Sequence, residues 1–96
     1  VIIQPTAALT AIDVNRGGDK RSNLSINIEA AEEAARQLRL RNLGGVVMID
    51  FLKSPNKNAE GQMIAALEKA LNDDPCTVQM HGLTALGLME LARKRR

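Results

Sequence analysis

The stretch Leu9-Thr10-Ala11-Ile12-Asp13-Val14-Asn15 decides the fold together with a counterpart further along, Val46-Val47-Met48-Ile49-Asp50-Phe51. Both are rich in apolar and β-branched residues, which is typical of strands, and each carries one aspartate. Successive side chains of a strand point to opposite faces, so Asp13 and Asn15 share a face. Burying an ionised carboxylate is costly unless a cation or donor compensates it, so each aspartate marks a candidate site.

A helix is expected between these two strands. Apolar residues recur there at intervals of three and four, which is one face of an α-helix: Leu24, Ile28, Ala31, Ala35 and Leu38. Ser22 or Ser25 is a suitable N-cap, and Gly44-Gly45 ends the helix and its turn. A strand–helix–strand unit predicts that Leu9–Asn15 and Val46–Leu52 are parallel. As neighbours they bring both aspartates to their carboxyl ends, where open α/β sheets bind ligands.

Further elements flank this unit. Val1–Gln4 and Thr77–Met80 are predicted strands, and Ala59–Leu71 is a predicted helix. Ala85–Ala92 fits a strand or a short helix, and Gly87 favours the strand because glycine weakens helices. The order β-β-α-β-α-β-β predicts an α/β fold: a single small mixed sheet with two main helices. The 96 residues are enough for one domain.

The composition is that of a soluble globular chain, with 45% hydrophobic and 25% charged residues. Phe51 is the only aromatic residue, so this chain offers no base-stacking platform beyond it. No apolar run is long enough to span a membrane. The single cysteine, Cys76, excludes an internal disulfide and a multi-cysteine zinc site, and with no signal-peptide pattern this favours the cytoplasm. The start at Val1, without methionine, suggests a piece of a longer protein.

The two aspartates predict a metal site. Mg²⁺ prefers hard oxygen ligands and is often held by one or two carboxylates, with waters and substrate phosphates completing its shell. Asp13 and Asp50 suffice for such a site and leave positions open for a phosphodiester. Asn15 is expected to orient the carboxylate of Asp13 or a bound water. The alternative is that each aspartate merely caps a following turn.

Other reactive residues give weaker signals. His81, the only histidine, is a candidate general acid or base, although a lone histidine beside a loop glycine is more often structural or simply exposed. Cys76 has no base beside it in sequence, which argues against a nucleophile. At the basic carboxyl end, Arg93, Lys94 and Arg95 are candidate RNA contacts, with a solvated charged tail as the alternative.

Four stretches of the chain closely resemble the ribonuclease E/G family: Ala8–Asn15, Asn27–Gly45, Ile49–Phe51 and Leu86–Arg95. The resemblance implies that residues 1–96 are a single catalytic subdomain with a deoxyribonuclease-I-like fold. It also implies that Asp13 and Asp50 are the catalytic residues that bind Mg²⁺ and that Asn15 supports Asp13.

The same resemblance implies the function of a Mg²⁺-dependent endoribonuclease that cuts single-stranded RNA internally, in RNA processing and decay. The remaining domains of the parent enzyme would supply most of the RNA binding, so the isolated fragment is expected to be weakly active or inactive. A homo-oligomer stays open. The alternative reading is a non-catalytic RNA-binding or protein-interaction module.

Overall fold

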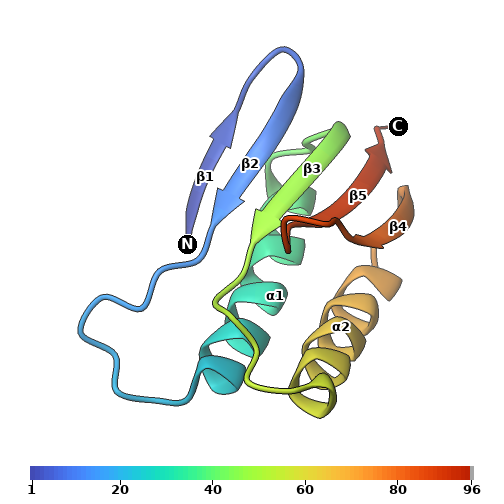
Figure 1. Cartoon of the computed structure of the whole chain (residues 1–96). Coiled ribbons are helices and arrows are strands. Elements are labelled where there is room, and N and C mark those ends of the chain that lie inside the picture. The colour runs from blue at the N-terminus through green and yellow to red at the C-terminus, as the bar shows by residue number, and fades with distance from the viewer. Residues whose placement is uncertain (96) are drawn as a thin grey trace.

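The computed structural model describes residues 1–95. These residues form a single mixed sheet with both helices on one side (Figure 1). This confirms the predicted α/β class and the order β-β-α-β-α-β-β. The elements are β1 (Ile2–Pro5), β2 (Leu9–Asp13), α1 (Asn23–Leu40), β3 (Gly45–Asp50), α2 (Lys57–Asn72), β4 (Thr77–Leu83) and β5 (Met89–Lys94).

The strands lie in the order β1-β2-β3-β5-β4. The two aspartate-bearing strands, β2 and β3, are parallel neighbours, as the sequence predicts, and the other pairings are antiparallel. The β2–β3 register sets Asp13 directly opposite Asp50. The strand–helix–strand unit therefore delivers the two carboxylates to the same edge of the sheet.

Several boundaries differ from the sequence-based ones. β2 ends at Asp13, so Asn15 lies beyond the strand. β4 continues to Leu83, three residues past its expected end at Met80. The second helix starts at Lys57 rather than Ala59, because the Asn56 side chain caps it by accepting a hydrogen bond from the Ala59 N–H at 2.8 Å.

The ambiguous segment Ala85–Ala92 is a strand only from Met89 onward. Before it, the Thr84 N–H donates to the Leu88 carbonyl at 2.8 Å, and the Gly87 N–H donates to the Thr84 carbonyl at 2.9 Å. These bonds close a turn and join β4 to β5 as a hairpin. The preference for a strand over a helix is thus confirmed, but the strand is shorter than expected because its first residues form the turn.

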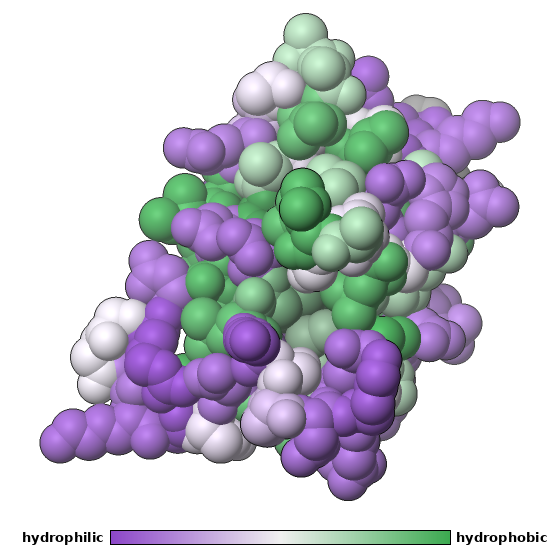
Figure 2. Space-filling model, in the orientation of Figure 1, coloured by the Kyte–Doolittle hydropathy of each residue, from purple (hydrophilic) through white to green (hydrophobic). Residues whose placement is uncertain are grey.

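The core lies between the helices and one face of the sheet. Each central strand turns alternate side chains inward, and these are almost completely buried: Ile12, Val47, Ile49, Met89 and Leu91. α1 meets them mainly through alanines such as Ala31 and Ala35, whose small side chains let the helix approach closely. Figure 2 shows a hydrophobic band through the middle of this view with hydrophilic residues at its borders. The face opposite the helices carries Asp13 and Asp50.

Candidate metal site

Asp13 and Asp50 lie side by side at the carboxyl ends of β2 and β3, and both are exposed. Neighbouring strands are about 4.8 Å apart, so their side chains start close together on one face. Just past the paired residues, the Val14 N–H donates to the Asp50 carbonyl at 3.1 Å. This bond continues the strand pairing by one step and holds both aspartates at a fixed separation.

Within residues 1–95, neither carboxylate forms an ion pair or takes a hydrogen bond from another protein group. This speaks against the turn-capping alternative, in which each oxygen would accept a backbone N–H. Two neighbouring, unneutralised carboxylates repel each other, and a divalent cation removes that repulsion. The hard oxygen donors fit Mg²⁺, which commonly takes one or two protein carboxylates.

The described residues offer no group of three or more His, Cys, Asp or Glu side chains placed to share one ion. A metal at Asp13 and Asp50 would therefore take its remaining ligands from water or substrate oxygens, the usual arrangement for Mg²⁺ at phosphate chemistry. Such a donor set would leave the remaining coordination positions open to substrate. That openness is typical of a catalytic site rather than of a structural one.

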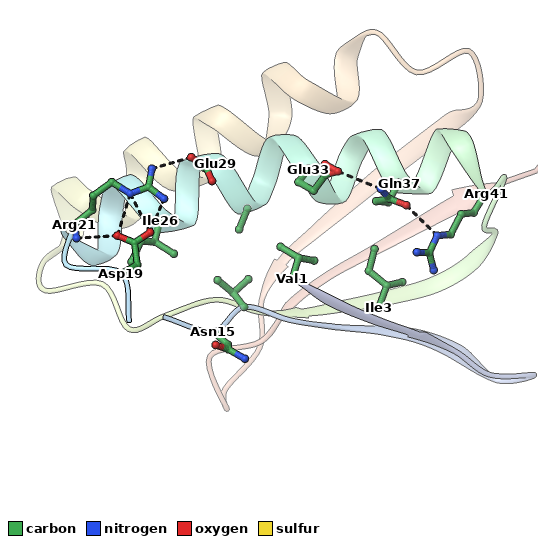
Figure 3. Close-up of a pocket in the computed structure, with 12 residues that line it drawn as sticks. Val1, Ile3, Asn15, Asp19, Arg21, Ile26, Glu29, Glu33, Gln37 and Arg41 are labelled. Atoms are coloured by element: carbon green, nitrogen blue, oxygen red, sulfur yellow. Dashed lines mark hydrogen bonds and ion pairs between the residues drawn. The ribbon is translucent and has the colours of Figure 1, made fainter. Parts of the chain in front are cut away.

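Asn15 lies two residues beyond Asp13 and is exposed. Figure 3 shows its side chain pointing away from α1, on the rim of the pocket between that helix and the first strands. The support of Asp13 by Asn15 stays a prediction.

The pocket of Figure 3 has both apolar and charged lining residues, and several of the charged ones are paired. The Arg21 guanidinium binds Asp19 at 2.6 Å and Glu29 at 2.7 Å. Hydrogen bonds from the Arg21 side chain and backbone lower the pKa of Asp19 to about 2. These ion pairs tie the loop after β2 to the first turns of α1, and the pocket lies apart from the two-aspartate face.

A residue that sequence reasoning missed anchors the segment after Asp50. Asn27 of α1 is completely buried, and its side-chain amide donates to the Leu52 carbonyl at 2.8 Å while accepting from the Leu52 N–H at 2.9 Å. Asn23, one turn earlier, donates to the Lys53 carbonyl at 2.9 Å. The two hydrogen bonds between Asn27 and Leu52 fix the backbone two residues past Asp50. The only available signal was an asparagine next to the apolar face of a predicted helix.

An open cavity of about 450 Å³ lies beside Asp50. It is bounded by the segment after β3, by Met63 of α2 and by the exposed tip of the β4–β5 hairpin at Leu86. Lys53 also lines it and supplies a positive charge near the aspartates. The flank on the α2 side is thus largely apolar and carries one cation, Lys53, and one anion, Glu60.

His81 lies on β4 and pairs with Glu90 of β5, with 2.9 Å between Nδ1 and Oε2. Both side chains are more than a third exposed. Glu90 is opposite Met48 on β3, and Met48 precedes Asp50 by two residues on the same face. The pair therefore shares a sheet face with the two aspartates but lies one row away from them.

The basic carboxyl end divides between the interior and the surface. Arg93 is only 2% exposed, and its guanidinium donates to both oxygens of Asp74, from Nε at 2.8 Å and from Nη2 at 3.0 Å. Its Nη1 donates to the Leu43 carbonyl at 3.0 Å. The expectation that Arg93 contacts RNA is therefore corrected: its side chain faces the helices and is fully engaged. Lys94 and Arg95 are exposed.

None of the helices in the described chain is long and apolar enough to cross a membrane.

The fold and the open, two-carboxylate edge together define a class: an α/β subunit with a candidate hard-metal site at the carboxyl ends of parallel strands. Comparison with known protein families matches residues 1–96 to the Ribonuclease E/G family. The chain belongs to this family.

Individual relatives agree. The chain is 48% identical to Ribonuclease E of Nostoc sp., 45% identical to Ribonuclease E of Synechocystis sp. and 43% identical to Ribonuclease G of Escherichia coli. Each similarity covers 99% of this chain but only 15%, 15% and 21% of the respective relative. The chain thus spans about a fifth or less of the length of these proteins. These matches confirm the family expected from the four resembling stretches.

Proposed function

We propose that this chain is the catalytic subdomain of a Mg²⁺-dependent endoribonuclease that cuts single-stranded RNA internally in the cytoplasm. Membership of the ribonuclease family supports a ribonuclease role. The observation that carries the proposal is the register of Asp13 with Asp50, which sets two exposed carboxylates side by side. No other pair of carboxylates at strand ends is brought together in this way among the described residues.

Each residue has a separate task in this proposal. Asp13 and Asp50 hold the cation through one carboxylate each, and Asn15 orients Asp13. When bound, Mg²⁺ would lower the pKa of a water molecule that it coordinates, and it would stabilise the negative charge that develops on the phosphodiester. Asn27 keeps the Asp50 backbone in place through its two hydrogen bonds to Leu52. The open sheet face gives the RNA strand room to approach.

RNA affinity must come mainly from elsewhere in the parent enzyme. The chain has a net charge of only +2 and a single aromatic residue, which is buried. Weak phosphate attraction and no exposed stacking ring make poor RNA binding. The exposed cations Lys53, Lys94 and Arg95 are the local candidates for phosphate contacts. The remaining domains of the parent enzyme are the expected partners, and a homo-oligomer stays open.

A substitution series in the complete protein that carries this chain tests the proposal. Asp13→Asn and Asp50→Asn keep the size of each side chain but remove its charge, so each should lower Mg²⁺-dependent cleavage of a single-stranded RNA by at least a hundredfold. Asp73→Asn, at an exposed site after α2, is the matched control and should cleave at the parent rate. Circular dichroism checks that all variants are folded.

Near-parent cleavage by either site variant would remove that aspartate from the mechanism. The alternative, a non-catalytic RNA-binding module, predicts a different pattern: RNA affinity that falls steeply with salt and does not respond to Mg²⁺. In that case Lys94→Ala and Arg95→Ala would weaken RNA binding, whereas the aspartate variants would leave it unchanged.

A further inference from the structure

The His81–Glu90 pair has no task in the metal site, yet both side chains lie on the same open face of the sheet. We propose that Nε2 of His81 accepts a hydrogen bond from the 2′-hydroxyl of a nucleotide next to the cleaved bond, so that His81 positions the strand and distinguishes RNA from DNA. This inference rests on the proposed function, because it takes single-stranded RNA as the ligand of this face.

A β-bulge places His81 on this face. Met80 pairs with Leu91 and Gly82 pairs with Glu90, so His81 is the extra residue between them. Two residues of β4 therefore oppose the single residue Glu90, and Gly82 has a φ of +96°, which favours glycine. After the bulge, Leu83 turns back toward the core. The bulge thus fixes His81 and Glu90 next to each other without disturbing the buried side of the hairpin.

The hydrogen bond to Glu90 settles which ring nitrogen is free. An ionised carboxylate can only accept, so Nδ1 of His81, at 2.9 Å from Glu90 Oε2, must carry the hydrogen. In the neutral ring, Nε2 then has a lone pair and can only accept. Phosphates and ether oxygens of an RNA backbone are acceptors as well. The 2′-hydroxyl is the donor that this backbone offers, and DNA lacks it.

The strand register shows which part of the RNA His81 can meet. Glu90 is opposite Met48, two residues before Asp50. With strands about 4.8 Å apart and a rise of about 3.3 Å per residue, the Cα of Glu90 lies roughly 8 Å from that of Asp50, and His81 lies one strand further, at roughly 12 Å. His81 is thus too far to act on a phosphodiester held at the two aspartates. It is at a suitable distance for a flanking nucleotide.

The surface between the two places suits a nucleic-acid strand. Met48 and Ala11 lie in the same row as Glu90, on β3 and β2, two residues before the aspartate row, and neither carries a charge. Both are partly exposed, so they form an apolar floor rather than a barrier. A strand crossing this floor from the aspartates toward β4 passes Glu90 and ends over the free Nε2 of His81.

The test uses the complete protein that carries this chain and RNA oligonucleotides with a single cleavage site. Each oligonucleotide carries one 2′-deoxy substitution, moved stepwise along the positions that flank the cut, and kcat/KM is measured at pH 8, where imidazole rings are ordinarily neutral. One flanking position should lower kcat/KM by about three- to tenfold, mostly through KM, which is the effect of one neutral hydrogen bond.

The variants identify the acceptor. His81→Ala should lower kcat/KM on all-ribose RNA by the same factor and abolish the deoxy effect at that one position. Glu90→Gln should keep the effect, because a glutamine oxygen still accepts from Nδ1, whereas Glu90→Ala should reduce it. Gln79→Ala is the matched control: Gln79 lies two residues earlier on the same face of β4, is also exposed, and should leave the deoxy effect intact.

Two results would overturn the proposal. If His81→Ala keeps the full deoxy effect at every position, another group reads the 2′-hydroxyl. If no single deoxy substitution matters, the face does not read it at all. Both results leave the two-aspartate site standing as long as Asp13→Asn abolishes cleavage. If the aspartate variants cleave normally while His81→Ala removes the deoxy effect, the metal assignment fails and the His81 contact survives.

Discussion

At the scale of single residues, the two aspartates of the candidate site are positioned by their backbone and not by contacts of their side chains. Asp50 is exposed and makes no side-chain contact that would hold it among residues 1–95. Its position comes from the backbone on either side: the parallel register with β2 before it, and the Asn27 clamp on Leu52 after it. The position of this exposed, proposed metal-binding carboxylate therefore depends on a buried amide of α1.

Asn27→Ala should lower the free energy of unfolding by about 2–4 kcal/mol, because it removes a completely buried amide and leaves the partly buried N–H and carbonyl of Leu52 without partners. Asn58→Ala makes the same chemical change at an exposed site of α2 and should stay within about 0.5 kcal/mol of the parent. Denaturant unfolding of both variants measures the difference. Equal stabilities would show that the clamp contributes nothing.

The buried pair of Arg93 and Asp74 predicts a pH-dependent stability. Burial alone would raise the pKa of Asp74, but the hydrogen bonds from Arg93 and from the Cys76 N–H outweigh it and lower the pKa. A lowered pKa means that the stabilisation is present above the unfolded-state value of about 3.9 and is lost as the pH falls through the folded-state value.

Asp74→Asn should therefore destabilise the chain strongly at pH 7, by about 3–5 kcal/mol, because Arg93 is left buried without its counter-ion. The difference from the parent should shrink as the pH is lowered below about 4, where the parent also loses the pair. Urea unfolding at several pH values measures it. A difference that is constant from pH 7 to pH 2 would mean that the pair does not account for the pH dependence.

At the scale of elements, two glycines give opposite predictions for the same substitution. Gly45 opens β3 with a φ of +87°, a conformation that other residues rarely adopt. Gly61 lies inside α2, where a Cβ would meet nothing within 4 Å. Gly45→Ala should destabilise by about 1–3 kcal/mol through strain at the start of the strand that carries Asp50.

Gly61→Ala should instead stabilise by about 0.5–1 kcal/mol, since alanine favours a helix over glycine. Thermal unfolding of the two variants, measured side by side, gives both signs in one experiment. A stabilising or neutral Gly45→Ala would contradict the account of how β3 begins, and a destabilising Gly61→Ala would contradict the account of α2.

Most elements could be predicted from the sequence because their signals are local. Alternation marked the first aspartate strand, an apolar run marked the second, and spacing of three and four residues marked α1. The parallel pairing of the two strands followed from the strand–helix–strand order. What sequence could not give were contacts between distant elements. Neither the Asn27–Leu52 clamp nor the Arg93–Asp74 pair is visible in spacing, because each depends on how elements far apart in the sequence pack together.

The candidate site was predicted to a similar extent. Sequence reasoning singled out Asp13 and Asp50 as a carboxylate pair, and the register sets these two residues opposite each other. Sequence reasoning grouped Arg93 with Lys94 and Arg95 as candidate RNA contacts. In the structure, strand alternation in β5 turns Arg93 to the helix side and Lys94 to solvent. His81 drew attention only as a lone histidine, and its pairing with Glu90 depends on a bulge that no local pattern announced.

At the scale of the whole molecule, the chain combines a candidate metal site with a net charge of only +2 and no exposed aromatic residue among those described, so it has few groups that would bind RNA. It belongs to the Ribonuclease E/G family but spans only 15–21% of the relatives compared. The open sheet face bears both the aspartates and the His81–Glu90 pair, so under the proposed function the RNA would lie on this face. The central claim is that the two aspartates bind a divalent cation there.

A Mn²⁺ titration of the chain followed by ¹H–¹⁵N NMR tests that claim most directly, since the paramagnetic ion broadens signals close to where it binds. We expect broadening centred on the amides of Asp13, Val14 and Asp50, competed by Mg²⁺ and lost in Asp50→Asn but kept in Asp73→Asn. Broadening centred elsewhere, or an unchanged pattern in Asp50→Asn, would contradict the two-aspartate site.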